Sequence, residues 1–550
     1  MKYIADLHCH PSFKPYNKKG YEKKPNGQPY TIWDYVPEFE DFNRKKVIKG
    51  IIQEVLGGTE KGSQTNLNLL VNNNVRSLFC VIHPIERGWF NIDEDKLLLK
   101  FAECLWDFKT NLNTIGAWFT GVPINKIKSI RKELADKSPL NYYLDETYAE
   151  YKFLRKSQKV KGAGGETFKL VSNYEEYLEV INDPDAVAGI ITIEGGHALN
   201  NLQKVTDFEI EYQDHSSEKQ NFIREEIYDN IERIKGIGGH DHSFKPKHTP
   251  FFLTLAHFYN NFLSGHAKSY TGIVAGIFDQ KAAMYDGITP VGTEAIKKLL
   301  KRDRESGERR VLIDVKHMSL KARKQYYQIV KGLNESGDQV PIIFSHGAVA
   351  GYNWSAFQGE DGSDDNIGYF SHMSINLYHE DIVEIFNSDG LIGLAPHEGR
   401  MPGNDAKKEF KELARQIRWR NNNQQALLRQ QRDAYVRLYL ANIFQVIFSI
   451  GRKEAWDHVC IGSDYDGIMD PFDRYPQADD FNILLGDIML FLKNPTSLRI
   501  YEGSYPKTLD ANEIREMMYG YTPRQIADKI AFENIDLFLS KYFTDSYRLG

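Results

Sequence analysis

Cysteine is scarce in this sequence, with four residues among 550. They lie far apart, and no two of them form a Cys-x-x-Cys pair: Cys9, Cys80, Cys104 and Cys460. This spacing indicates neither a disulfide framework nor a zinc ribbon. Reduced thiols in a cytoplasmic protein are the simpler interpretation.

Segments typical of export or of membranes are also missing. The chain does not begin with a basic stretch followed by an apolar run, so no signal peptide is predicted. No run of about 18 apolar residues predicts a membrane span, and no apolar tail predicts an anchor. We therefore expect a cytoplasmic protein without a membrane partner.

An excess of basic residues is missing as well. The formal net charge is −6, with 69 Lys and Arg against 75 Asp and Glu, whereas nucleic-acid-binding domains usually show basic clusters. The arginines between 415 and 437 lie in a segment with helical character, and acidic segments surround them. A solvated helix face explains them better than a nucleic-acid contact, so no nucleic-acid partner is predicted.

Three common catalytic and nucleotide-binding motifs are absent. The sequence has no Gly-x-Ser-x-Gly elbow, which argues against a serine hydrolase. It has no Gly-x-Gly-x-x-Gly after a strand and no P-loop, so the usual sites for dinucleotides and nucleoside triphosphates are not predicted.

Eight apolar runs have the length and composition of buried strands, and helical segments separate most of them. The expected strands are 3–7, 76–83, 187–194, 251–257, 311–317, 341–346, 391–396 and 458–464. The expected helices are 91–113, 174–182, 218–235, 291–303, 320–333, 380–387, 406–450, 514–518 and 522–542. This order predicts an α/β fold of the (β/α)8 TIM barrel type. Residues 1–550 then form a single barrel domain with large insertions near 11–74, 114–180 and 400–450.

Polar residues stand at the carboxyl ends of six of these strands: His8, His10, Glu194, His257, His317, His346 and Asp464. His8 and His10 leave their strand on one face, because residues i and i+2 of a strand point the same way. The active site of such barrels lies at this end, where buried imidazoles and carboxylates are costly unless they are paired or bind a metal. Any one of them could be structural, but six such strand ends predict a site for zinc or a similar divalent ion.

Motifs around these residues run through most of the chain. The most specific is Ile-Glu-Gly-Gly-His at 193–197. The others are Leu-Thr-Leu-Ala-His at 253–257, Gly-Ile-Thr-Pro-Val-Gly at 287–292, Ile-Asp-Val-Lys-His-Met-Ser at 313–319, Ile-Phe-Ser-His at 343–346 and Gly-Ser-Asp-Tyr-Asp-Gly at 462–467. Together they resemble the membrane (renal) dipeptidase family, a branch of the amidohydrolase superfamily.

The resemblance implies a metallohydrolase that uses two divalent ions, with zinc favoured, to cleave the amide bond of a small peptide with an activated water. One ion would lie between His8, His10 and Glu194. The other would lie between Glu194, His317 and His346, so that Glu194 bridges the two.

The resemblance also implies two catalytic residues. His257 would polarise the scissile carbonyl, and Asp464 would handle the proton of the attacking water. A non-catalytic, metal-stabilised binding barrel is an alternative that these two residues argue against, since a pure binder needs no proton carrier. The expected partner is a small-molecule or dipeptide substrate, and a homo-oligomer is left open.

Two positions depart from the family pattern. The family usually has His-x-Asp on its first strand, where this chain has His8-Cys9-His10. After the sixth strand the family carries an Arg-Asn pair that helps to hold the substrate carboxylate, and the counterpart here, Ile375-Asn376, lacks the arginine. A binuclear metal hydrolase of a lactone, a cyclic amide or an N-acyl amino acid is therefore a second alternative.

We expect His10→Ala to lose one metal ion, and His10→Asp to keep metal binding and to shift activity toward dipeptides. Aspartate restores the ligand that the family uses, whereas alanine removes a ligand without replacing it. Elemental analysis of the purified variants and a dipeptide panel check both expectations. Unchanged metal content in the alanine variant would show that His10 is not a ligand.

Overall fold

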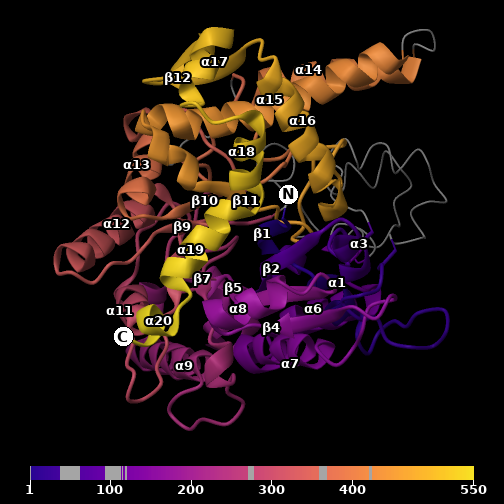
Figure 1. Ribbon diagram of the computed structural model, residues 1–550. Coiled ribbons are helices and arrows are strands. Elements are labelled where there is room, and N and C mark those ends of the chain that lie inside the picture. The colour runs from indigo at the N-terminus through magenta and orange to yellow at the C-terminus, as the bar shows by residue number, and fades with distance from the viewer. Residues whose placement is uncertain are drawn as a thin grey trace, which may run out of the picture.

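A computed structural model describes residues 2–37, 62–92, 113, 116–117, 120–270, 278–357, 368–419 and 424–550. Eight parallel strands lie in the middle of the molecule, with helices around them (Figure 1). In spatial order they are β1 (Ile4–Cys9), β2 (Val75–Ile82), β5 (Ala186–Glu194), β7 (Phe252–Thr254), β8 (Leu312–Asp314), β9 (Ile343–Phe344), β10 (Leu391–Leu394) and β11 (Val459–Ile461). The predicted (β/α)8 barrel is confirmed.

The two ends of the strand order meet where β1 comes beside the residues that follow β11. The backbone N–H of Asp464 donates to the carbonyl of His8 at 2.9 Å, and that of His10 donates to the carbonyl of Tyr465 at 3.0 Å. Cys9 and Tyr465 form a parallel bridge between these two bonds. The contact that closes the barrel therefore also places the strand-one histidines next to Asp464.

The strands are buried along their whole length because the helices cover their outer face and side chains fill the interior. The helices that follow the strands are α8 (Tyr174–Ile181), α9 (Ser217–Lys235), α11 (Pro290–Leu300), α12 (Leu320–Glu335), α13 (His379–Asn387), α15 (Gln424–Ile450), α16 (Phe481–Lys493), α18 (Pro523–Asp528) and α19 (Asn534–Tyr542). Local chemistry sets several of their ends. Thr289 caps α11 by accepting from the Gly292 N–H at 2.9 Å, and Pro290 starts that helix.

Several strands end two or three residues earlier than predicted, so the polar residues lie on short loops beyond them. One cause is Asp314, whose Oδ1 accepts the backbone N–H groups of Lys316 and Ser345, each at 3.0 Å. These two N–H groups therefore form no backbone hydrogen bonds between β8 and β9. His317 and Asp464 also leave the extended conformation, with φ of 65° and 61°.

The predicted insertions carry secondary structure of their own. The stretch around 11–74 holds α1 (Phe13–Lys18) and α3 (Leu67–Asn72), and the stretch 114–180 holds α6 (Ile124–Ala135), α7 (Tyr148–Ser157), β4 (Thr167–Leu170) and α8. The expected helix at 406–450 is two helices, α14 (Asn404–Trp419) and α15, and α14 extends outward from the body (Figure 1). Most of the expected helix 91–113 lies outside the described residues.

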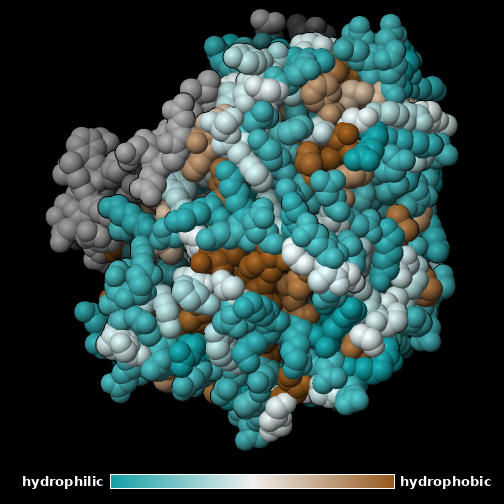
Figure 2. Space-filling view, turned by 90° about the vertical axis from the view of Figure 1, so that its left-hand side faces the viewer, coloured by the Kyte–Doolittle hydropathy of each residue, from teal (hydrophilic) through white to brown (hydrophobic). Residues whose placement is uncertain are grey.

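Outside the insertions, the elements that were not predicted include α16, α20 (Asp545–Leu549) and the hairpin of β12 (Leu498–Glu502) and β13 (Tyr505–Leu509). That the whole chain is one domain stays a prediction. The part of the chain described here holds no helix that is both long and apolar enough to cross a membrane. The face beside α12 is mostly hydrophilic, with an elongated hydrophobic strip near its centre and smaller hydrophobic patches elsewhere (Figure 2).

A buried ion pair fixes the packing of α12 against α13. Arg323 and Asp381 are both fully buried, with Nη2 and Oδ2 3.0 Å apart, and Arg323 also donates to the carbonyl of Ser374 at 2.8 Å. Asp381 accepts further bonds from the hydroxyl of Tyr327 (2.9 Å) and the backbone N–H of Tyr378 (2.9 Å). The pair is thus satisfied on both sides.

We expect Arg323→Met to lower the free energy of unfolding by about 3–5 kcal/mol, because it leaves the Asp381 carboxylate buried without its partner. Urea denaturation of the variant and the wild type checks this value. Lys321→Met, on the exposed side of the same helix, is the control and should change the free energy by less than about 0.5 kcal/mol. Equal denaturation midpoints for Arg323→Met and the wild type would contradict the expectation.

Candidate metal centre

Glu194, the last residue of β5, lies at the centre of a cluster of histidines. Its side chain is 2% exposed. Four Nε2 atoms surround Oε1: those of His8 (3.4 Å), His317 (3.5 Å), His257 (3.7 Å) and His346 (3.7 Å). Two nitrogens lie near Oε2: Nε2 of His10 (3.4 Å) and Nδ1 of His83 (3.5 Å). These histidines come from the carboxyl ends of β1, β2, β7, β8 and β9, so the barrel brings them together.

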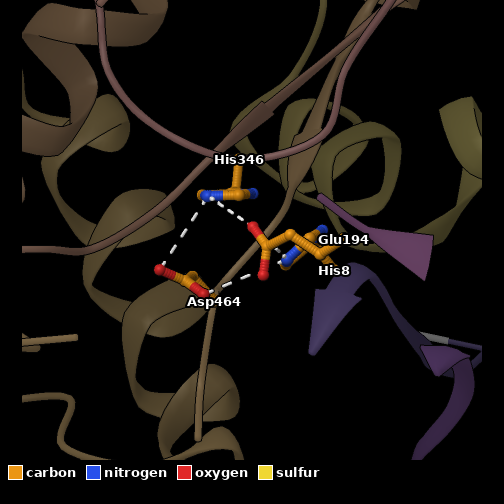
Figure 3. A group of neighbouring side chains, drawn as sticks. All are labelled: His8, Glu194, His346 and Asp464. Atoms are coloured by element: carbon orange, nitrogen blue, oxygen red, sulfur yellow. Dashed lines mark ion pairs between the residues drawn. The ribbon is translucent and has the colours of Figure 1, made fainter. Parts of the chain in front are cut away.

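Asp464, which follows β11, also belongs to this cluster. Its Oδ1 lies 3.3 Å from Nε2 of His10, and its Oδ2 lies 3.9 Å from Nε2 of His346. Figure 3 shows the side chains of His8, Glu194, His346 and Asp464 converging on one point. The Asp464 side chain is 13% exposed, against 4% or less for the histidines around Glu194. It therefore lies at the open edge of the cluster.

Two glycines, Gly195 and Gly467, lie so close to side chains of the site that a Cβ at either position would clash with them. Gly195 has φ of +90°, and a Cβ there would come within 2.3 Å of the ring of His197. A Cβ on Gly467 would lie 2.0 Å from Oδ1 of Asp464 and 2.7 Å from Nε2 of His10. Any side chain at position 467 would displace the two groups that face each other, so the site requires glycine there.

Two residues of the cluster have strained backbone conformations. His317 and Asp464 adopt left-handed conformations, which cost about 1–3 kcal/mol each for residues with a side chain. Neighbouring bonds hold them in place: the His317 carbonyl accepts from the N–H of Ala267 at 2.8 Å, and the Asp464 N–H donates to His8. The left-handed conformation directs both side chains toward Glu194.

The distances in the cluster fit ligands of a metal ion better than hydrogen bonds. Donor–acceptor distances in N–H···O bonds are about 2.7–3.2 Å, shorter than the 3.3 to 4.0 Å measured here. Zinc bonds of about 2.0–2.1 Å at tetrahedral angles place two ligands of one ion about 3.3–3.4 Å apart. Both ring nitrogens of His8 and of His10, and Oε1 of Glu194, are buried without a hydrogen-bond partner among the described residues. A bound cation would satisfy Oε1 of Glu194 and the Nε2 atoms of His8 and His10 that face Glu194.

The protonation state of His346 also indicates a metal site. The Ser345 hydroxyl has one proton, and it donates it to Oδ2 of Asp314 at 2.6 Å. Its oxygen must then accept from Nδ1 of His346, 2.9 Å away. Nε2 of that ring is left without a proton, facing the oxygens of Glu194 and Asp464. Acceptors that face one another in this way need a proton or a cation between them, and a hydrogen-bonded second nitrogen is usual for a metal-binding histidine.

Burial sets the charges in the cluster. It lowers the pKa of His8 to about 4 and lowers the pKa values of His257, His317 and His346 well below the ordinary 6.5. These rings are neutral near pH 7, as metal ligands must be. Burial also raises the pKa of Glu194 well above its ordinary value. A nearby cation would reverse that shift, because it stabilises the carboxylate.

All seven predicted site residues lie in this cluster, and the role of each stays a prediction. Within the described ranges, two groups have ligand atoms within 4.8 Å of one another: His8, Glu194, His346 and Asp464, and His83, Glu194 and His257. Glu194 belongs to both groups. The groups differ from the predicted ligand sets, because His8 and His346 share one group and His10 and His317 belong to neither.

Two residues of the cluster were not predicted. His83 follows β2 directly, and the signal for it was present, because the expected second strand ends on this histidine. Glu86 lies three residues further on and holds Nδ1 of His257 at 2.5 Å. It follows no strand end and matches no motif, so the sequence gives no signal for it.

No family model matches the chain, and no curated protein matches it. Solved structures that it resembles include a probable dipeptidase from Pseudomonas aeruginosa, with 12% identity over 87% of this chain and 89% of that chain and a TM-score of 0.39. A metallopeptidase described as a dipeptidase has 11% identity over 93% and 99%, with a TM-score of 0.40. A metallopeptidase from Rhodobacter sphaeroides, bound to a phosphinate mimic of the dipeptide L-Ala-D-Ala, has 13% identity over 92% and 100%, with a TM-score of 0.39. At these values the account of the site rests on this chain's own residues.

We expect Glu194→Gln to lose at least one divalent ion per chain, because the amide keeps the shape of the side chain but removes the charge shared by both ligand groups. Elemental analysis of the purified variant checks this, with circular dichroism to confirm its fold. Glu398→Gln is the matched control. Burial raises the pKa of the Glu398 carboxyl to about 8, and it belongs to neither ligand group. Full metal content in Glu194→Gln would contradict the expectation.

Proposed function

We propose that this protein is a metal-dependent hydrolase that cleaves the amide bond of a small peptide, as a dipeptidase does. The observation that supports the proposal most is the convergence of six imidazoles with the carboxylates of Glu194 and Asp464 at the carboxyl ends of the barrel strands. We propose two divalent ions there, with zinc favoured by the ligand types. When bound, such ions lower the pKa of a water and polarise the bond to be cleaved.

Asp464 is the residue that we assign to proton transfer. It would accept the proton of the attacking water and pass it to the leaving amine, as a positioned general base and acid does. Two features support this role. Its side chain lies at the open edge of the cluster, where a substrate arrives, and its left-handed backbone holds the carboxylate between His10 and His346.

A cation beside the centre favours a substrate with a carboxylate. The side-chain amide of Asn376 donates to the backbone carbonyl of Arg400 at 2.9 Å, and the Arg400 guanidinium donates to the carbonyl of Ser269 at 2.8 Å. Arg400 forms no ion pair within the described part of the chain. Burial is the main cause that lowers the pKa values of Lys316 and His317, and the positive charge of Arg400 adds to both shifts. An arginine is thus present near the centre, supplied by the segment after β10 and not by the position before Asn376.

This arginine separates the candidate substrates. Dipeptides and N-acyl amino acids carry a carboxylate that Arg400 would bind by charge-assisted hydrogen bonds. Lactones and cyclic amides carry none, and they would leave the guanidinium without a counterion. The dipeptide is therefore our first candidate substrate, and the N-acyl amino acid is our second. A non-catalytic barrel is the least supported alternative, because it does not explain the position of Asp464.

A substrate panel with the Asp464→Asn variant tests the proposal. We expect wild-type turnover of dipeptides with a free carboxyl terminus, with much weaker turnover of their C-terminal amides and of lactones. Asp464→Asn should reduce kcat by about 10²–10⁴-fold, because the amide accepts no proton from the water. Metal content is measured in parallel, so that a lost ion is not mistaken for a lost base.

The control for this test is Asp473→Asn, the same chemical change at an exposed position of the same loop region. It should leave kcat unchanged. Activity that survives Asp464→Asn, or the absence of turnover for every compound in the panel, would refute the proposal.

A further inference from the structure

We propose that His83 is a metal ligand and that His83, Glu194 and His257 hold one of the divalent ions. This assignment rests on the metal centre of the proposed function but not on its reaction. It adds a ligand from the second strand, which the resemblance to the dipeptidase family does not imply. It also changes the role expected for His257.

The position of His83 is set by the strand and by a buried carboxylate. The residue follows β2 directly, and its backbone N–H donates to Oε2 of Glu150 at 3.0 Å. Glu150 is itself fully buried and accepts the hydroxyl of Ser12 at 2.6 Å through its other oxygen. The backbone at His83 is thus held on one side, and the ring extends toward Glu194.

The ring of His83 has no hydrogen bond that explains its position. Its side chain is 3% exposed, and Nδ1 lacks a hydrogen-bond partner anywhere in the described ranges. Oε2 of Glu194 lies 3.5 Å from Nδ1 of His83, a distance that is too long for an N–H···O bond and suits two ligands of one ion.

Glu86 prepares His257 as the second imidazole ligand. One oxygen of Glu86 accepts the backbone N–H of Tyr259 at 3.2 Å, and the other lies 2.5 Å from Nδ1 of His257. Nδ1 therefore carries the ring proton, and the bare Nε2 points toward Oε1 of Glu194, 3.7 Å away. A carboxylate behind the ring is the usual companion of a metal-binding histidine. In this state Nε2 has no proton to donate to a substrate carbonyl.

The rings of His83 and His257 pack edge to face with centroids 4.7 Å apart, and both border the Glu194 carboxylate. Two imidazoles and one carboxylate make up the protein ligands of many catalytic zinc sites and of non-haem iron(II) sites. Three protein ligands leave positions free for water or substrate. The chemistry of this group therefore suits Zn²⁺ or Fe²⁺ with an open coordination position.

The test compares metal content in two variants at position 83 and one control. His83→Ala removes the ligand, and His83→Gln removes it while keeping most of the volume and a polar group. In zinc-loaded protein we expect each folded variant to lose one ion per chain relative to the wild type and to keep the ion held by the His8 group. His248→Ala is the control, because His248 is also buried but bonds to the hydroxyl of Tyr151 and lies in neither ligand group.

A second measurement needs no variant. Anomalous scattering at the zinc edge from crystals of the zinc-loaded wild type should give a peak within about 2.2 Å of Nδ1 of His83. Wild-type metal content in a folded His83 variant, or a crystal with zinc at Glu194 but no peak within bonding distance of His83, overturns the proposal. Neither result depends on activity, so the assignment can fail while the proposed hydrolase stands. A wild-type protein that binds no zinc would contradict both the ligand assignment of His83 and the proposed metal-dependent hydrolase.

Discussion

The structure of the site depends on one constraint: a buried carboxylate, Glu194, faces the bare nitrogens of several neutral histidines. Burial prevents these rings from taking up protons, and the bonds behind them at Ser345 and Glu86 fix which nitrogen faces inward. Acceptors placed this close repel one another unless a cation lies between them. The barrel closure, the glycine at 467 and the left-handed backbone at Asp464 all serve to hold this arrangement.

The strands, and most of the polar residues at their carboxyl ends, could be predicted because both are local properties of the sequence. An apolar run marks a strand, and a histidine at its carboxyl end marks the mouth of the barrel, as at His317 and His346. His83 had the same signal at the end of the second strand. Glu86 and Arg400 had none, because they lie in loops and are positioned by distant groups: the backbone of Tyr259 for Glu86, and the amide of Asn376 for Arg400.

The charge balance distinguishes this centre from the family that the motifs resemble. A histidine at position 10 replaces a carboxylate, and Arg400 and the buried Lys316 add positive charge close by, although burial lowers the pKa of Lys316 to about 7. A centre with two divalent ions and few carboxylates would hold an anionic substrate strongly. Under the proposed function, Arg400 would take the place of the family's missing arginine, and residues far apart in the sequence would determine specificity.

The most direct test of this account is a calorimetric titration of chelator-treated wild-type protein with zinc. The account predicts uptake of two ions per chain, with protons released only to the extent that Glu194 is protonated beforehand. Because the ions would bind the folded state, uptake should also raise the melting temperature. A protein that takes up no zinc and unfolds at the same temperature with and without it would contradict the central claim, since the facing acceptors would then be stable without a cation.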